Sequence, residues 1–262
     1  IWHFDDKVAQ YYLLRAVNVP IPMTWVLWSR RRTAEFLDAA QYPLVLKLAG
    51  GIVSQNVRLV HDAREARYYA DQLFGPGMYR LPAPTSGVRR AGRRLEAALR
   101  VLLSKPPSAR VQLQRDYVLL QEFLPGNTFD TRVTVIGNRA FAFRRHNRPG
   151  DFRASGSGRI DWDPTQIAED AVRLAFRAAR TLQTQSLAVD VLRRNSEPVV
   201  GEISYYYEGW AVAACPGHWQ LHDDPESGRI TWVDDPMRPE DAIWVDFLAR
   251  LGERINGTKP SQ

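Results

Sequence analysis

Two neighbouring apolar segments each carry one acidic residue, and they constrain this chain of 262 residues more than any other feature. Asp190 lies in segment 187–192 and Glu202 in segment 198–204. The polar stretch 193–197 between them predicts a turn, so the segments are expected to form a β-hairpin. If the turn centres on the fourth residue of that stretch, the two acids are cross-strand neighbours. Opposed like charges destabilise a sheet, so the pattern indicates a partner that neutralises both acids.

A divalent metal ion is one such partner, because hard cations bind carboxylate oxygens. Ser204 lies two residues after Glu202, on the same face of the strand, and is a candidate for a third oxygen ligand. The alternative is that the acids face solvent or pair with Arg132 or Arg153. The residues by themselves leave both interpretations open.

A second candidate site is a strand followed by a glycine-containing loop and another strand. Only four of the 35 basic residues are lysines, so Lys47 at the end of the segment 42–49 is conspicuous. Backbone amides of a flexible loop can bind phosphates, and a nearby ammonium group can neutralise them. No Gly-Lys-Ser/Thr sequence occurs, which excludes a Walker P-loop. The loop residues with these properties are Gly50, Gly51, Ser54 and Asn56.

A third candidate site is the arginine-rich region 130–158. Arginine side chains bind phosphate or carboxylate through two parallel hydrogen bonds, and the Ser- and Gly-rich end of this region suits a mobile loop. A solvated basic surface is the alternative for this region taken alone.

Taken together, these motifs resemble the ATP-grasp superfamily, especially its ribosomal-protein-S6-modification-like carboxylate–amine ligases. Asp6-Lys7 is similar to the first lysine motif, and 43–51 to the second lysine with its glycine-rich flap. Segment 120–126 is similar to the hinge that contacts adenine, and Asp130-Thr-Arg132 to the Asp-x-Arg strand pair. Gly150-Asp-Phe-Arg153 is similar to the segment that reaches the terminal phosphate, and Asp190 with Glu202 to the metal-binding acids.

The resemblance implies an α+β ATP-grasp fold with ATP between two lobes, and it assigns roles to individual residues. Two Mg²⁺ ions are expected, with Mn²⁺ as a substitute. The family has Glu-x-Asn at the last metal position, whereas this chain has Glu202-Ile-Ser204. The implied metal ligands are Asp190, Glu202 and Ser204; the implied catalytic residues are Lys47, Arg132 and Arg153; and the implied ATP-binding residues are Lys7, Lys47, Gly50, Gly51, Ser54, Asn56, Gln121, Glu122, Phe123, Leu124, Asp130, Arg153 and Ser155.

The implied reaction joins a carboxylate to an amine through an acylphosphate, with release of ADP and phosphate. The acceptor is expected to be a sugar acid or an amino acid, because the tail resembles that of ATP-grasp proteins associated with bacterial surface-sugar synthesis. Two rivals remain: a phosphotransferase on the same fold, and a non-catalytic module that binds nucleotides or polyanions.

The expected organisation is a linker helix over 1–20, an N-terminal lobe over 21–116 and a C-terminal lobe with the tail over 117–262. Residues 75–115 are interpreted as an insertion containing a basic helix. The final helix, about 239–256, is expected to turn its apolar residues inward, namely Ala242, Val245, Leu248 and Leu251. The family's N-terminal domain is not within this chain, which begins at Ile1, so an upstream segment is left open.

Charge and cysteine content predict partners and location. The net charge of +6 favours anionic partners such as ATP and carboxylates. Nucleic acid is not expected, because no aromatic residues interleave with the arginines of 89–104. One cysteine, Cys215, and no apolar run of about 20 residues predict a cytoplasmic protein without a membrane span. Cys215, His218 and His222 are too few for a zinc site, and a homodimer is left open.

Overall fold

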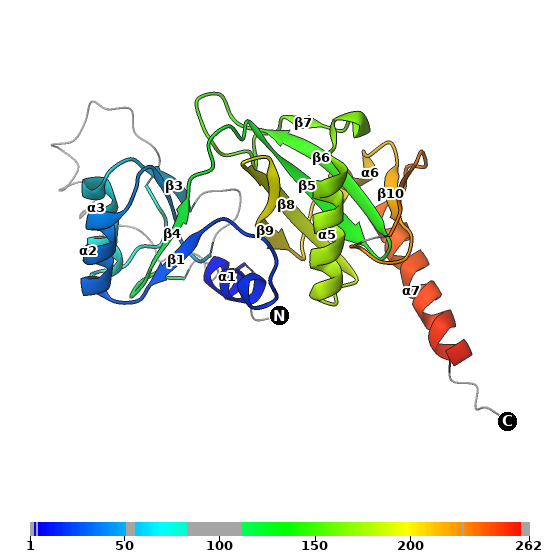
Figure 1. Ribbon diagram of the computed structural model, residues 1–262, viewed down its shortest axis with the longest axis horizontal. Helices are drawn as coiled ribbons and strands as arrows, with labels where there is room; N and C mark the ends of the chain where they lie inside the picture. The colour runs from blue at the N-terminus through cyan, green and yellow to red at the C-terminus, as the bar shows by residue number, and fades with distance from the viewer. Residues whose placement is uncertain (1–2, 4, 51–55, 83–111, 227, 258–262) are drawn as a thin grey trace. The chain divides into compact units, whose positions relative to one another are not determined.

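The computed structural model describes residues 3, 5–50, 56–82, 112–226 and 228–257, except for the side chains of 253–257 (Figure 1). The chain divides into two compact units. One comprises residues 24–123, and the other combines residues 1–23 with 124–262. Both contain helices and antiparallel sheet, so the expected α+β class is confirmed.

The unit of residues 24–123 is a four-stranded antiparallel sheet in the order β1-β4-β2-β3. Leu44, Leu46 and Leu48 occupy every second position along and just beyond β2. They are buried in one core cluster with residues of the two helices of this unit, Arg30–Ala39 and Ala63–Leu73. The Asp62 side chain accepts a hydrogen bond from the Glu65 amide and caps the second of these helices. The elements are β1 (Thr24–Leu27), α2 (Arg30–Ala39), β2 (Leu44–Lys47), β3 (Val57–Val60), α3 (Ala63–Leu73) and β4 (Val118–Glu122).

The other unit is built on a seven-stranded antiparallel sheet in the order β11-β10-β6-β5-β8-β9, with β7 paired to β6. Its strands are β5 (Phe129–Ile136), β6 (Arg139–His146), β7 (Ile160–Asp161), β8 (Ser186–Arg194), β9 (Glu197–Ser204), β10 (His218–Leu221) and β11 (Ile230–Val233). Its helical elements are α1 (Lys7–Ala16), the 3₁₀ turn η1 (Pro164–Gln166), α5 (Glu169–Thr181), α6 (Gly209–Ala213) and α7 (Pro239–Gly257).

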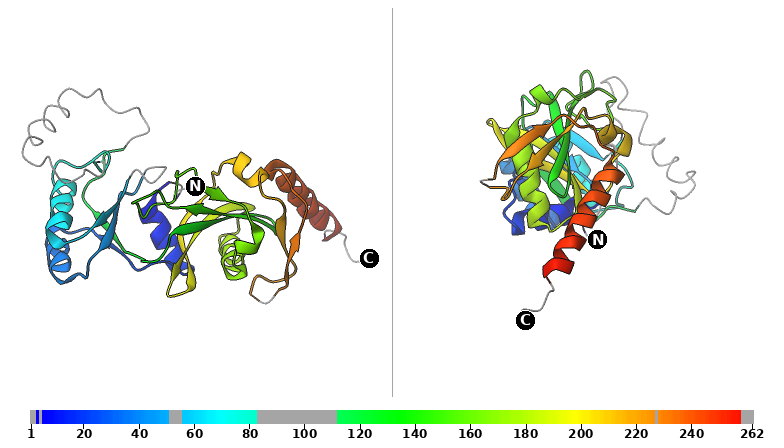
Figure 2. Two further views of the ribbon diagram at one scale, coloured as in Figure 1. Left: turned by 90° about the horizontal axis from the view of Figure 1, so that it is seen from above. Right: turned by 90° about the vertical axis from the view of Figure 1, so that its right-hand side faces the viewer.

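Helices cover both faces of this sheet (Figure 2). On one face, the apolar side of α5 packs with Val133, Val135 and Val189 in the main core cluster. On the other face, Ile136 and Phe141 form a smaller cluster with residues of α6 and the start of α7. Within β5, the residues that alternate with Val133 and Val135 therefore face away from α5.

The β8–β9 hairpin has a two-residue turn, and both of its residues have positive φ, 50° at Asn195 and 74° at Ser196. That conformation suits the twist of the flanking strands. The ladder shifts by one residue beyond Val191, where Gly201 is the extra residue. The shift places Asp190 opposite Glu202.

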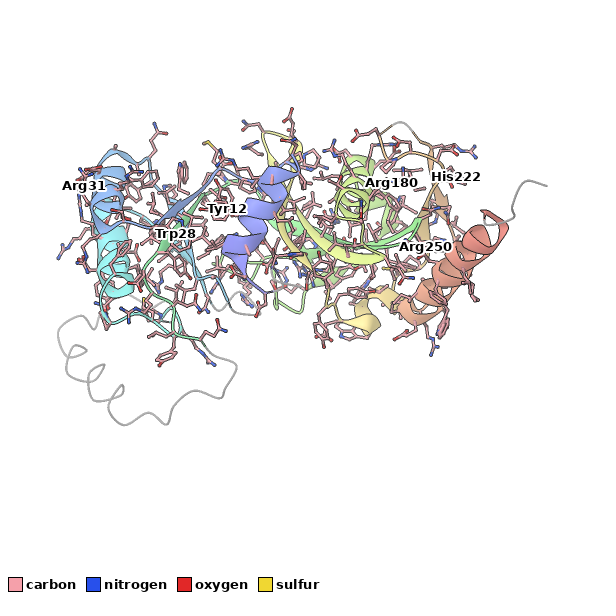
Figure 3. The ribbon with its side chains drawn as sticks, turned by 90° about the horizontal axis from the view of Figure 1, so that it is seen from below. Tyr12, Trp28, Arg31, Arg180, His222 and Arg250 are labelled. Atoms are coloured by element: carbon pink, nitrogen blue, oxygen red, sulfur yellow. The ribbon has the colours of Figure 1, made fainter. Side chains whose placement is uncertain are left out.

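Helix α1 covers the exposed edge of β9. The Gln10 side chain donates to the Ile203 carbonyl at 3.0 Å and accepts from the Ile203 amide at 3.2 Å, so it pairs with the strand as a neighbouring strand would. Asp6 caps α1 through the Val8 and Ala9 amides. Tyr12, labelled in Figure 3, is 43% exposed.

Several expectations differ from the structure. Strand β4 belongs to the first sheet, so the compact units divide at 23/24 and 123/124 rather than at 20/21 and 116/117. Helix α1 belongs to the unit of the larger sheet. The inward face predicted for α7 is wrong, because only Ala242 of its predicted residues is buried. The basic helix 89–104 lies outside the described residues, and no helix within those residues is long and apolar enough to cross a membrane.

Candidate functional site

A row of side chains runs across four strands on the sheet face opposite α5. Arg132 on β5 stands opposite Phe143 on β6 and opposite Asp190 on β8. Asp190 in turn stands opposite Glu202 on β9. Cross-strand partners project to the same face of a sheet, so strand pairing alone brings Arg132 and the two acids together.

Four buried or half-buried charges form one hydrogen-bonded network on this face. The Arg132 guanidinium donates to both Asp190 oxygens, at 2.7 and 2.8 Å. Arg145 donates to both Asp130 oxygens, at 2.7 and 2.6 Å, and its Nη2 also lies 2.8 Å from Asp190 Oδ2. Two acids and two arginines make the network neutral, which is the condition for keeping charges inside a protein.

The network separates the behaviour of its two acids. Burial alone would raise the pKa of Asp190, but the charges and hydrogen bonds of Arg132 and Arg145 outweigh burial and lower it. Burial raises the pKa of Asp130, although Arg145 opposes this shift. Asp190 is therefore held in its ionised form more firmly than Asp130. Both Asp130 oxygens accept hydrogen bonds from Arg145.

Lys7 and Glu202 form the next charge pair in the row. Lys7 Nζ lies 3.3 Å from Glu202 Oε1, and the Lys7 side chain is buried whereas that of Glu202 is 39% exposed. The contact follows from α1, because the Gln10 bonds to Ile203 fix the helix beside β9. A residue from the start of the chain thus reaches one of the two hairpin acids.

The donor types at Asp190 and Glu202 fit a hard divalent cation. In this structure Arg132, Arg145 and Lys7 compensate their charges, so a cation would compete with these groups. The described residues contain no cluster of three or more His, Cys, Asp or Glu side chains suited to a metal. A hydroxyl is therefore the remaining candidate donor. Ser204 Oγ bonds the carbonyl and amide of Tyr206, which leaves one of its two lone pairs.

The segment after β6 places Arg153 against Asp151. Arg153 Nη2 lies 2.6 Å from Asp151 Oδ2, and Arg153 Nε also donates to this carboxylate. Burial would raise the pKa of Asp151, but the hydrogen bonds from Arg153 outweigh it and lower the pKa. Arg148 donates to the Ser155 carbonyl at 2.7 Å, so Ser155 takes part in this segment through its backbone.

In the other unit, Lys47 and Gln121 lie on the same face of the four-stranded sheet. Lys47 on β2 stands opposite Leu119, and Val45 stands opposite Gln121, so the alternation puts both polar residues on the face away from Leu44 and Leu46. Gln121 donates to Thr24 Oγ1 at 2.9 Å. The next predicted residues follow along the chain: Glu122 ends β4, and Phe123 and Leu124 are where the chain passes from one unit to the other.

The base of the loop after Lys47 is fixed by Asn56 and Tyr117. Asn56 Nδ2 donates to the Gly50 carbonyl at 2.7 Å, and its Oδ1 accepts from the Leu81 amide at 3.2 Å. Tyr117 Oη accepts from the Ala49 amide at 2.7 Å. Asn56 thus closes the loop through its amide nitrogen and holds the Leu81 backbone through its amide oxygen. The predicted residues Gly51 and Ser54 lie outside the described residues.

The three tail residues whose types could bind zinc make hydrogen bonds within the protein. The thiol of Cys215 is buried and bonds the Ala142 carbonyl, and burial raises its pKa to about 12. His218 bonds the Asp235 carbonyl, and His222 bonds Thr231 Oγ1.

Residues 95–206, which include the whole charged row on β5, β6, β8 and β9, match the family model of the RimK-like ATP-grasp domain. This part of the chain is similar to the RimK-like ATP-grasp domain. A solved structure, phosphoribosylamine–glycine ligase from Thermotoga maritima, is similar with a TM-score of 0.51 and 16% identity, and the likeness covers 77% of this chain and 47% of that one. The expected ATP-grasp fold is therefore confirmed.

Two curated relatives extend the comparison. The ribosomal protein bS6–L-glutamate ligase of Escherichia coli O139:H28 is 25% identical over 202 residues, covering 76% of this chain and 55% of the relative. A probable alpha-L-glutamate ligase of Klebsiella pneumoniae is 24% identical over 242 residues, covering 90% of this chain and 65% of the relative. The chain thus spans between about half and two thirds of the length of these relatives.

The sequence analysis included Arg145 only as part of the arginine-rich region 130–158, and it missed Gln10 and Tyr117. Arg145 had a signal, since it faces the same side of β6 as Phe143 and stands opposite Asp130. Gln10 and Tyr117 had none, because their partners Ile203 and Ala49 are backbone groups far away in sequence.

Proposed function

We propose that this protein is an ATP-dependent carboxylate–amine ligase. The observation that carries the proposal is the charged row on one sheet face, where Lys7 pairs with Glu202 and Arg132 pairs with Asp190. Arg132, Asp190 and Glu202 lie within the residues similar to a RimK-like ATP-grasp domain. The two basic residues can neutralise a polyphosphate, and the two acids would hold the divalent cation that neutralises it further. The names of the curated relatives as glutamate ligases support the same reaction class.

The proposed reaction has two steps. A carboxylate oxygen of the acceptor attacks the γ-phosphorus of ATP, the bond to the β,γ-bridging oxygen breaks, and ADP leaves from an acylphosphate. The amine then attacks the acyl carbon, phosphate leaves with the bonding electron pair, and the nitrogen loses a proton. Phosphoryl transfer depends on alignment and charge neutralisation, so no protein nucleophile is required.

Asp190 and Glu202, with Ser204, are proposed to hold Mg²⁺, or Mn²⁺ in its place. The ions would neutralise phosphate charge. Within the chain itself, Arg132 and Arg145 keep Asp190 ionised, and Lys7 holds Glu202 in place until ATP binds. Lys7 is also assigned to the phosphates, because its ammonium group lies beside Glu202, which would hold the ion that neutralises them.

The remaining ATP contacts are proposed residue by residue. Lys47 and the loop of Gly50 and Gly51 are assigned to the phosphates. Arg153 is assigned to the transferred phosphoryl group, beside Ser155. The hinge Gln121, Glu122, Phe123 and Leu124 is assigned to adenine. Asp130 is among the implied ATP-binding residues, and its bidentate bond to Arg145 favours a supporting role under the network.

The substrates are proposed to be a sugar acid or amino acid as carboxylate and a small amine, in the cytoplasm. The test is an ADP-release assay with panels of both, in the presence of hydroxylamine, which converts an acylphosphate to a stable hydroxamate. A hydroxamate with free phosphate supports the ligase. A stable phosphorylated product would indicate a phosphotransferase, and no ADP release with any acceptor would indicate a binding module.

Glu202→Gln is the cleaner test of the metal proposal, because Glu202 is partly exposed whereas Asp190→Asn also unbalances two arginines. We expect Glu202→Gln to lose Mg²⁺-dependent turnover while it stays folded at the assay temperature, although it also loses the pair with the buried Lys7. Glu197→Gln, an exposed acid on the same strand, is the matched control. Wild-type turnover in Glu202→Gln would remove Glu202 from the metal site.

Arg153→Ala separates chemistry from binding. If Arg153 contacts the transferred phosphoryl group, its loss lowers kcat more than it raises the KM for ATP. Lys47→Ala is expected to weaken ATP binding in a calorimetric titration. A KM effect with intact kcat in Arg153→Ala would reassign this arginine to ATP binding.

A further inference from the structure

The outer side of α7 carries the largest group of exposed apolar side chains on any element of the described residues. Trp244 and Phe247 form an edge-to-face pair with ring centroids 5.8 Å apart. Large exposed apolar patches on folded proteins mark interaction surfaces. The members of this patch are Trp244 (62% exposed), Val245 (42%), Phe247 (47%), Leu248 (58%) and Leu251 (42%).

The described contacts that anchor the helix to its own unit come from other residues. Ala242 is fully buried in the cluster with Phe141 and Val212. Asp246 accepts a hydrogen bond from Gln185 at 2.9 Å and pairs with Arg250, which is labelled in Figure 3. Beyond these anchors, α7 extends past the sheet (Figures 1 and 2).

We infer that the α7 patch binds the α7 patch of a second copy of this chain, with the two helices antiparallel. The proposed two-fold axis passes between Phe247 and Leu248. Trp244, Leu248 and Leu251 are spaced by four and three residues, the spacing of a helix–helix seam. A two-fold contact uses the same patch on both copies, so one stripe supplies both halves of the interface.

The size of the patch suits a dimer. Half of a large apolar side chain leaves about 100 Å² accessible. Five such residues on each of two helices would bury on the order of 1,000 Å², the lower limit for a specific protein interface.

The shape of the patch favours the antiparallel arrangement. About the proposed axis, Trp244 of one copy faces Leu251 of the other, next to Gly252. A Cβ placed on Gly252 would meet no described atom within 4 Å, and Gly252 has no side chain to oppose a neighbouring Trp244. A parallel pair would instead set one Trp244 against the other and leave the space at Gly252 unfilled.

Charge argues against a membrane or nucleic acid as the occupant. The described side chains of α7 include the acids Glu240, Asp241 and Asp246 but only one base, Arg250. Surfaces that bind anionic lipid or nucleic acid are rich in Lys and Arg. Antiparallel helices also oppose their dipoles, which favours pairing with a second α7.

Light scattering after gel filtration tests the dimer over about 1 to 100 µM protein, because association depends on concentration. Wild type should approach twice the chain mass of 29.9 kDa at the upper end. Leu248→Glu should remain at 29.9 kDa with an unchanged melting temperature, whereas Tyr68→Glu, at a 55% exposed site on α3, should dimerise like wild type. A wild type that is monomeric throughout, or a Leu248→Glu variant that dimerises equally, would overturn the proposal.

Cysteine cross-linking tests the orientation. Under mild oxidation, Leu248→Cys should link to its own copy, and a mixture of Trp244→Cys and Leu251→Cys should give the mixed dimer. Trp244→Cys alone should not link, because the pairing holds its two copies apart. Cys215 contributes little background, because it is buried and its pKa is raised to about 12. Strong self-linking of Trp244→Cys would contradict the antiparallel pairing.

Discussion

Asp190 stands opposite Glu202 across the β8–β9 pair, although the turn of this hairpin centres between Asn195 and Ser196. A regular ladder from that turn would place Gly201 opposite Asp190. The bulge takes up Gly201, and Glu202 moves into the opposing position with its side chain on the same face as Asp190. The two acids meet through a local irregularity in the strand, and the site depends on it.

The first prediction concerns Arg145, which alone bonds both buried acids. Arg145→Met should lower the free energy of unfolding by about 3–5 kcal/mol, because it leaves Asp130 without its bidentate partner and Asp190 with only Arg132. Urea denaturation measures this loss. Arg144→Met is the matched control, since Arg144 pairs with the partly exposed Asp161 and should cost about 1 kcal/mol.

A double variant, Arg145→Met with Asp130→Asn, also tests the network. Removing one charge of each sign should recover part of the lost stability, because the double variant has fewer uncompensated buried charges. Equal stability of Arg145→Met and wild type would show that the network does not support the fold.

The sequence predicted much of this site because cross-strand position is encoded locally. Asp190 and Glu202 were recognised as neighbours from the hairpin, and the same reasoning offered Arg132 as a partner, which the structure confirms. It assumed a turn centred on residue 196, one half-residue away from the observed turn. The bulge at Gly201 compensates for that difference, because it shifts the ladder by one residue. The sequence could not predict the bulge, since a glycine in a strand does not by itself reveal where a ladder shifts.

The sequence could not predict which side of α7 faces the protein. Its apolar residues have the spacing of a buried helix face, and Val245, Leu248 and Leu251 were assigned inward on that basis. The structure instead buries Ala242 and Asp246. A helical pattern indicates that an apolar face needs a partner, but it does not say whether the partner belongs to the same chain.

The pH dependence of stability provides a prediction at Asp161. Hydrogen bonds from Arg144 lower its pKa in the folded protein below the usual value for Asp, about 3.9. A lowered folded pKa contributes stability above the unfolded pKa and loses it as the pH falls through the folded pKa. Asp161→Asn should therefore cost about 1 kcal/mol at pH 7.

The same comparison at acid pH is the control. As the pH falls below the lowered pKa of Asp161 in the folded protein, the wild-type side chain becomes protonated, so the difference between wild type and Asp161→Asn should shrink toward zero in chemical denaturation. A difference that persists unchanged at both pH values would assign the effect to shape rather than charge.

Gln10 provides a prediction about the edge of β9. Gln10→Ala should lower the free energy of unfolding by about 1–3 kcal/mol, because the amide and carbonyl of buried Ile203 lose their partners. Gln10→Glu preserves the shape but removes the donor to the carbonyl and places a charge at a buried position, so it should cost at least as much. Tyr12→Ala, on the exposed side of α1, should change stability by less than about 0.5 kcal/mol.

Gly137 links the β5–β6 turn to α7. Its φ is +57°, and a Cβ at this position would lie 2.0 Å from Asp246 Oδ1, so Gly137→Ala must displace the anchor of α7 as well as strain the backbone. Gly150→Ala isolates the strain, because Gly150 has φ +69° with no atom within 4 Å of the added Cβ. Backbone strain alone costs about 1–2 kcal/mol. We expect Gly137→Ala to be at least about 2 kcal/mol less stable than Gly150→Ala in urea denaturation, with loss of amide protection in α7 by hydrogen exchange. Equal costs for the two variants would show that Asp246 gives way freely and does not anchor the helix.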